Sequence, residues 1–166
     1  MELEVFIEIP RGSANKYEYD KKRRVFKLDR ILFSSVHYPC DYGFIPDTLA
    51  LDGDPLDVLV IISQPTFPGC LMDVRVVGMC DMEDEKGQDE KILCVSKTDP
   101  RWNHIKSFED VPPHILKEVE HFFSVYKDLE KGETSIKGWV SGDKVETVIK
   151  EAFDRYEGEP MLPANH

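Results

Sequence analysis

Asp52-Gly53-Asp54-Pro55-Leu56-Asp57-Val58-Leu59-Val60-Ile61-Ile62 joins an acidic loop directly to an apolar run. The β-branched residues of the run over 58–62 predict a short buried strand. Gly53 permits a tight turn, and Pro55 stiffens the loop that leads into the strand. We therefore expect a strand of the core to anchor three aspartates in a fixed loop at its start.

Alternating and apolar runs on both sides of this stretch predict further strands. We expect them over residues 3–9, 15–20, 24–31, 71–79 and 92–95. The second and third form a hairpin with the tip Lys21-Lys22-Arg23, and a solvated turn explains that basic cluster. Alanine at Lys21 should then leave any activity nearly unchanged. The acidic segment 81–90 is expected to be an exposed turn between the last two strands.

The last third of the chain changes to a helical pattern, with apolar residues spaced three or four apart. A helix should follow Pro112-Pro113 and end before Gly132. Its apolar face consists of Ile115, Val119, Phe122, Tyr126 and Leu129. Asp143 followed by Glu146 resembles a capping box that opens a second helix. Short strands followed by two helices predict an α+β fold, mainly β, in one domain over 1–166.

Charge and composition restrict the function. The 166 residues include 21 Lys and Arg against 32 Asp and Glu, which gives a net charge of −11. Such an acidic surface repels nucleic acid and anionic membranes, so we expect neither as a partner. The chain opens with the acidic Met1-Glu2-Leu3-Glu4 rather than a leader, and no apolar stretch approaches the roughly 20 residues of a spanning helix. Four cysteines without a C-x-x-C pair indicate buried free thiols, and we expect a soluble, cytoplasmic protein.

Three carboxylates within six residues, Asp52, Asp54 and Asp57, repel one another unless cations neutralise them. Hard oxygen ligands without Cys or His favour Mg²⁺, Mn²⁺ or Ca²⁺ over zinc. A solvated turn explains this loop equally well when the loop is taken alone. An EF-hand is excluded, because the sixth position is Asp57 instead of Gly and the twelfth is Ser63 instead of Glu.

A second acidic group, Asp84 and Asp89, precedes Lys91. On a strand, Asp89 and Lys91 would face the same side because they are two residues apart. Alone, this segment is an ordinary charged hairpin turn. Beside the first loop it is a candidate for the opposite wall of one metal site.

Basic and aromatic residues add a second pattern. Lys16 and Glu18 share one face of a predicted strand, and Arg30 ends the next strand. Each such residue has an ordinary explanation as a surface charge or as core packing. Together with the carboxylates, they suit a polyanion bridged by divalent metals. Because no phosphate-binding G-x-x-x-x-G-K-[ST] loop and no nucleophile motif occurs, the residues indicate a metal-dependent phosphohydrolase that uses water.

Five blocks of the sequence resemble the soluble family I inorganic pyrophosphatases, in the family's order and across nearly the whole chain. They are residues 7–18 (IEIPRGSANKYE), 38–46 (YPCDYGFIP), 52–58 (DGDPLDV), 81–91 (DMEDEKGQDEK) and 121–130 (HFFSVYKDLE). The resemblance implies a five-stranded OB-like β-barrel with two flanking α-helices. It also implies a hydrolase of phosphate metabolism that cleaves inorganic pyrophosphate to two orthophosphates with a metal-activated water.

The resemblance further implies cofactors and an assembly. Three to four Mg²⁺ ions would bind per active site with substrate, and Mn²⁺ could replace them. The short chain resembles forms that are hexamers built as two trimers, so a homohexamer is expected.

The family's site residues carry over position by position. The two activating metals would bind Asp52, Asp57 and Asp89, with Asp57 bridging. Asp84 and Glu8, together with Asp89, would hold the metals that arrive with substrate, and Asp54 is the candidate general base. The expected substrate-binding residues are Lys16, Arg30, Tyr42, Tyr126 and Lys127, and the supporting residues are Glu18, Tyr38 and Lys91. Asp41 stands where some relatives have Asn, and we expect it to tune the local charge.

Three alternative functions share parts of this pattern. The first is an acidic OB-fold module that binds oligonucleotides, which the fold would permit. The net charge and the absence of a basic groove with aromatic side chains disfavour it. The second is a Ca²⁺-binding module, and the third is another metal-dependent phosphohydrolase that acts on nucleotides or polyphosphate.

Overall fold

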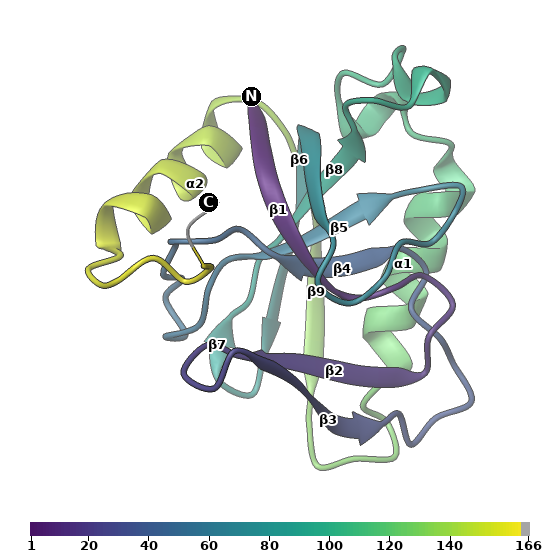
Figure 1. Ribbon diagram of the computed structural model, residues 1–166. Coiled ribbons are helices and arrows are strands. Elements are labelled where there is room, and N and C mark those ends of the chain that lie inside the picture. Colours follow the sequence, from purple (N-terminus) through teal and green to yellow (C-terminus); the bar gives the residue numbers. More distant parts are fainter. Residues whose placement is uncertain (164–166) are drawn as a thin grey trace.

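The computed structural model describes residues 1–163 and is mainly β (Figure 1). The strands are β1 Glu2–Ile9, β2 Asn15–Asp20, β3 Val25–Ile31, β4 Asp41–Phe44, β5 Asp57–Ile61, β6 Leu71–Asp84, β7 Gly87–Gln88, β8 Lys91–Ser96 and β9 Thr134–Val140. The α-helices are α1 Pro113–Val125 and α2 Asp143–Arg155, and two short 3₁₀ turns cover Pro100–Trp102 and Phe108–Asp110. Within 1–163, no helix is long and apolar enough to cross a bilayer.

Five strands pair in a closed ring. β1 pairs with both β4 and β6, β4 pairs with β5, β5 pairs with β8 in parallel, and β8 returns to β6. This ring confirms the predicted five-stranded barrel with two helices. β7 and β9 extend the sheet from β6, and β2 and β3 form a separate hairpin. Figure 1 shows this hairpin beneath the barrel, with α1 and α2 on different sides.

The apolar run of β5 is buried on both faces, which explains why it does not alternate with polar residues. Leu59 and Ile61 pack in a cluster with residues of α1, while Val58 and Val60 pack in a second cluster with residues of α2. The same division holds for β8. Each helix therefore covers one side of the same central strands, which makes β5 a rigid support for the loop before it.

The segment 81–90 is not simply the exposed turn that the sequence predicts. β6 continues to Asp84, and only the turn that follows it before β7 is fully exposed. Residues 79–84 pair with β9, which comes 50 or more residues later. Asp89, beyond β7, is only 8% exposed. The acidic composition of this segment does not predict the extension of β6, because the strand that pairs with it lies far away in the sequence.

The first helix is shorter than the apolar spacing predicts. It ends at Val125, and Tyr126 is its C-cap. The amide N–H groups of Asp128 and Glu130 each donate to the carbonyl three residues earlier, so the chain continues as turns. As a result Leu129, predicted on the buried face, is 68% exposed.

The predicted capping box of the second helix is wrong. Gly142 is the N-cap, with φ at +77°, and no side chain caps the helix. Asp143 and Glu146 instead lie in the first turn, where acidic side chains favour the positive end of the helix dipole. The strand β4 is a further difference, since no strand is predicted over Asp41–Phe44.

Gly43 in β4 allows the close approach of β1. A Cβ atom at this position would overlap the carbonyl oxygen of Phe6, which belongs to the backbone and cannot move aside. Because β1 and β4 pair here, with Ile7 opposite Gly43, the contact is fixed by the barrel itself.

We predict that Gly43→Ala lowers the free energy of unfolding by about 3 kcal/mol or more, since overpacking must displace the β1 backbone. Gly87→Ala is the matched control, because φ is +113° there but a Cβ atom meets nothing. That control should cost only about 1–2 kcal/mol of backbone strain. Urea unfolding of both variants measures the difference, and equal costs would refute the steric role of Gly43.

Candidate functional site

A polar cleft with a volume of about 580 Å³ lies between the barrel, the β2–β3 hairpin and the turns after α1. It gathers thirteen of the fourteen predicted site residues: Glu8, Lys16, Glu18, Arg30, Tyr42, Asp52, Asp54, Asp57, Asp84, Asp89, Lys91, Tyr126 and Lys127. The exception is Tyr38, which is 1% exposed and packs behind Tyr42 with ring centroids 5.3 Å apart. Tyr38 therefore supports the wall of the cleft from behind.

Strand starts place the carboxylates of the cleft floor. Asp57 is the first residue of β5 and Lys91 is the first residue of β8, and the two are paired in the parallel register. Asp89 lies two residues before this pair, on the same side as Lys91. The register of β5 and β8, with Asp89 just before β8, therefore brings three charged groups to one point.

The loop of Asp52 and Asp54 is a tight turn, as predicted. The amide N–H of Asp54 donates to Asp52 Oδ1 at 3.0 Å, and the amide N–H of Gly53 donates to the Ala50 carbonyl at 3.1 Å. Gly53 has φ at +91°, which glycine adopts without strain. Burial raises the pKa of Asp52, with a smaller contribution from the neighbouring Asp57 and Asp54.

Lys91 is the centre of the deepest charged group. Its Nζ atom lies 2.6 Å from Asp57 Oδ2, 3.0 Å from both carboxylate oxygens of Asp89, and 3.0 Å from the Tyr42 hydroxyl. Burial alone would lower the pKa of Lys91, but Asp57, Tyr42 and Asp89 outweigh it and raise that pKa well above its usual range. Burial raises the pKa of Asp89 to about 6, with Lys91 opposing the shift.

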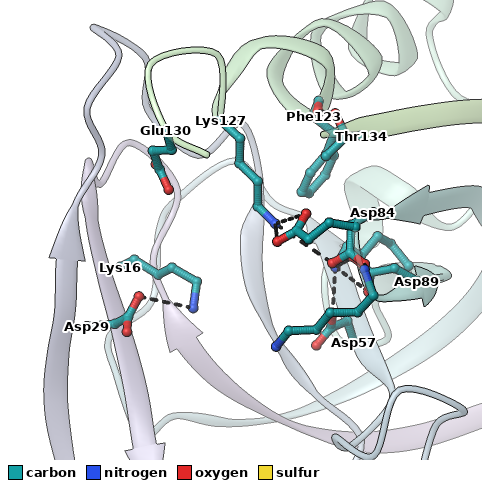
Figure 2. Close-up of polar contacts among 12 residues, drawn as sticks. Lys16, Asp29, Asp57, Asp84, Asp89, Phe123, Lys127, Glu130 and Thr134 are labelled. Carbon is teal, nitrogen blue, oxygen red and sulfur yellow. Dashed lines mark hydrogen bonds and ion pairs between the residues drawn. The ribbon is translucent and has the colours of Figure 1, made fainter. Parts of the chain in front are cut away.

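A second lysine lies across the upper part of the cleft. Lys127 Nζ is 3.7 Å from Asp84 Oδ2 and 3.3 Å from Glu85 Oε1. In Figure 2, Lys127 extends from the turn after α1 down toward Asp84. Burial alone would lower the pKa of Lys127, whereas Tyr126, Glu85 and Asp84 raise it, so the group stays charged.

The hairpin forms the third wall, where one carboxylate joins two cations. Asp29 Oδ2 lies 3.7 Å from Lys16 Nζ and 2.6 Å from Arg30 Nη1. Arg30 Nε also lies 2.8 Å from Glu130 Oε1, which connects the hairpin to the turns after α1. Figure 2 shows Lys16 and Asp29 on the hairpin with Glu130 above them.

Several cleft residues are absent from the predicted set. Three are carboxylates, Asp29, Glu85 and Glu130, and three are lysines, Lys21, Lys86 and Lys131. Glu85 and Glu130 lie inside the sequence blocks that resemble the family, and Asp29 directly precedes Arg30. Their positions next to predicted site residues could therefore have indicated them. The predicted turn at Lys21 is confirmed, but the side chain also lines the cleft.

Asp41 does not line the cleft. It is fully buried, and its carboxylate accepts hydrogen bonds from the Arg11 amide at 2.7 Å and from the Thr66 hydroxyl at 2.6 Å. It therefore joins two loops behind the site rather than tuning the charge of the cleft.

The cleft suits a hard divalent cation, because its acidic side chains offer carboxylate oxygens as ligands. The lining includes ten carboxylates against seven Lys and Arg side chains, which leaves three negative charges when every carboxylate is ionised. In residues 1–163, however, no three acidic, His or Cys side chains converge closely enough to enclose an ion. Ammonium groups stand between the carboxylates instead, as the contacts of Lys91 and Lys127 show.

Comparison with known proteins places the chain among characterised sequences and folds. The family model described as inorganic pyrophosphatase matches residues 5–157. The chain is 61% identical over 158 residues to the inorganic pyrophosphatase of Methanosarcina mazei, covering 95% of this chain and 94% of that one. It is 53% identical to the enzyme of that name from Halalkalibacterium halodurans, with 94% and 96% covered. The crystal structure of inorganic pyrophosphatase from Thermus thermophilus superposes with a TM-score of 0.91 at 46% identity, covering 95% of this chain and 92% of that one.

Glu8 is a cleft carboxylate whose acidity is strongly reduced. Its Oε2 accepts a hydrogen bond from the Tyr19 amide at 2.7 Å. Burial raises the pKa of Glu8 from its ordinary value of 4.5 to about 7, and the charges of Asp57 and Glu18 add to the effect. Glu8 is therefore partly protonated at neutral pH until a cation reaches it.

We predict that wild-type protein in chelator loses stability relative to Glu8→Gln as pH rises from about 4.5 to about 7. The folded-state pKa lies above the unfolded one, so the stabilising proton is fully present below pH 4.5 and is lost through pH 7. The loss should approach about 3 kcal/mol, because each pKa unit corresponds to about 1.4 kcal/mol. Urea unfolding of both proteins at pH 4.5 to 8 measures it, and a constant difference across this range would contradict the assignment.

Proposed function

The chain belongs to the inorganic pyrophosphatase family, and we propose that its cleft hydrolyses inorganic pyrophosphate to two orthophosphates with the help of divalent metal ions. One observation carries this function: the same cleft holds the acidic residues that suit Mg²⁺ and the basic residues that suit phosphate oxygens. We further propose that residues 1–166 act as one domain.

Charge balance supports three to four Mg²⁺ ions per cleft. The lining carries three net negative charges. The two phosphoryl groups of the substrate add roughly three to four more at neutral pH, since each phosphate carries about −1.5 to −2. Three to four divalent cations neutralise this sum, and two would not. Mn²⁺, which also prefers oxygen ligands, could replace Mg²⁺.

The cleft offers two groups of metal ligands. Asp52, Asp57 and Asp89 would hold the activating ions, and Asp84, Asp89 and Glu8 would hold the ions that enter with substrate. Bound Mg²⁺ would neutralise phosphoryl oxygens and acidify the attacking water.

The remaining residues bind and orient the reactants. Asp54 is exposed in the turn before β5, so its carboxylate is free to accept a proton from the attacking water. Lys16, Arg30 and Lys127 reach the cleft from opposite walls, and their charges suit the outer phosphate oxygens. Tyr42 and Tyr126, whose pKa values are both raised mainly by burial, remain protonated and can donate hydrogen bonds to the same oxygens. Fixed donors of this kind stabilise the charge that develops on the leaving phosphate without reorganisation.

We also propose a homohexameric, cytoplasmic enzyme. Large apolar side chains at the surface support assembly: Ile31 is 58% exposed, Phe33 59% and Leu129 68%. The four cysteines are free thiols, three of them buried and Cys70 half-buried, which suits a reducing compartment. Light scattering coupled to size-exclusion chromatography tests the hexamer directly.

We predict release of two phosphates per pyrophosphate in Mg²⁺ and none in excess chelator. Asp57→Asn and Asp89→Asn should each lower turnover at least about a hundredfold, since each removes a charged ligand from the floor of the cleft. Asp154→Asn on the exposed face of α2 is the matched control and should keep full activity. Near-normal turnover of the two cleft variants at saturating Mg²⁺ would contradict the proposed ligands.

The same assay separates the alternatives. Faster phosphate release from ATP or tripolyphosphate than from pyrophosphate would indicate another phosphohydrolase. Calcium affinity without any phosphate release would indicate a binding module, and tight, salt-sensitive binding of single-stranded DNA would indicate an oligonucleotide binder.

The rim of the cleft generates a further prediction. Lys21, Lys86 and Lys131 are exposed, line the cleft, and form no ion pair with any residue in 1–163. In a protein of charge −11, such cations concentrate an anionic substrate at the entrance.

Replacing these three lysines together by glutamine should lower kcat/KM about fivefold or more at low ionic strength, with a smaller change in kcat. The effect should shrink as salt screens the charges. The control replaces Lys106, Lys117 and Lys150, which are exposed outside the cleft and change the net charge equally. Equal effects of the two triple variants would show that only the overall charge matters.

A further inference from the structure

Lys91 differs from every other cation in the part of the chain that the structure describes. Among the Lys and Arg residues of 1–163, it alone is buried, with 3% of its surface exposed. The rings of Tyr42 and Phe123 lie 5.3 and 5.6 Å from its Nζ atom and cover the ammonium group. A buried charge is unfavourable unless it is paired, so this lysine must serve the groups that it contacts.

The contacts of Lys91 are complete. An ammonium group has three N–H donors, and four acceptor atoms lie within 3.0 Å of it, two on Asp89, one on Asp57 and one on Tyr42. The parallel register of β5 and β8 sets Asp57 directly beside Lys91. Figure 2 labels Asp57 and Asp89, which lie near each other in the cleft below Asp84. The lysine therefore holds two carboxylates together that would otherwise repel each other.

We propose that Lys91 is a tethered counter-ion, which neutralises and positions Asp57 and Asp89 before metal ions bind and yields part of that role to them. This rests on the proposed function, in which both aspartates are metal ligands. Lys91 is thus a positioning residue, and its action on the substrate goes through the carboxylates.

The comparison with Lys127 shows why Lys91 is suited to this role. Lys127 Nζ stays 3.7 Å from Asp84, beyond hydrogen-bond distance, and its other contacts are to the exposed Glu85. Lys91 has short contacts and is itself the first residue of the strand β8, so its ammonium group has little freedom to leave. Asp57 and Asp89 are consequently preorganised by Lys91, whereas Lys127 does not hold Asp84 in the same way.

The proposal implies a coupling between Lys91 and metal binding. The Lys91 ammonium group and the metal ions stabilise the same two carboxylates, so either one reduces the stabilisation that the other adds. This coupling is reciprocal. Removing the lysine should therefore harm the metal-free protein much more than the metal-bound protein. A residue with a purely structural role would lower the stability of both forms equally.

Lys91→Met keeps the approximate length of the side chain and removes its charge. We expect its Tm in chelator to fall well below that of wild type, and the rise of Tm on addition of Mg²⁺ to be at least twice the wild-type rise. Leu93→Ala, a buried strand residue that does not line the cleft, is the control. It should lower Tm to a similar degree with and without Mg²⁺. Equal behaviour of the two variants would overturn the proposal.

A second measurement uses the wild-type chain in case Lys91→Met does not fold. In protein labelled with ¹⁵N at the lysine side chains, the Lys91 ammonium signal is identified by its absence from Lys91→Arg. Mg²⁺ should shift this signal with the same midpoint as the rise of Tm. A signal that stays fixed while Mg²⁺ binds would also overturn the proposal. Neither measurement requires substrate, so absent pyrophosphate hydrolysis would refute the proposed function separately.

Discussion

Repulsion between carboxylates is the constraint on which the cleft depends. Ten acidic side chains line one cavity, and every one of them would gain from moving apart. The barrel prevents this, because the closest of them stand at or next to the first residues of strands that are buried on both faces. Asp57 cannot leave without β5, and β5 is packed between clusters that include both helices. The stability of the core is thus used to hold an arrangement that is unfavourable in itself.

Cations supplied by the chain make that arrangement tolerable. Lys91 at the floor, Lys127 above it, and Lys16 with Arg30 on the hairpin each lie beside a carboxylate. These pairs lie on different walls of the cleft, so each wall carries opposite charges side by side. The lining still carries an excess of negative charge, which favours the binding of divalent cations. Bound cations would in turn neutralise the charge of a substrate as negative as pyrophosphate.

The sequence predicts the parts of the site that depend on local geometry. The spacing of two between Asp89 and Lys91 predicts that both face the same side, and their 3.0 Å contact confirms it, although Asp89 lies just before β8 and not within a strand. Gly53 similarly marks the turn that the structure contains. The five-stranded barrel followed from the resemblance rather than from the apolar pattern, because its closure depends on the long-range pairing of β1 with β6. The extension of β6 along β9 escaped prediction for the same reason. Glu130 illustrates the limit for the site: nothing near it in sequence indicates that it would meet Arg30, a hundred residues earlier.

We propose above all that the cleft binds several divalent cations together with a diphosphate, and that the charges of the cations balance those of the lining and the diphosphate. Counting the ions tests it most directly. Equilibrium dialysis of the chain with Mn²⁺ and a non-hydrolysable diphosphate should give three to four ions per protomer, and the number should fall when the diphosphate is omitted. One ion or none in the presence of the diphosphate would contradict the account.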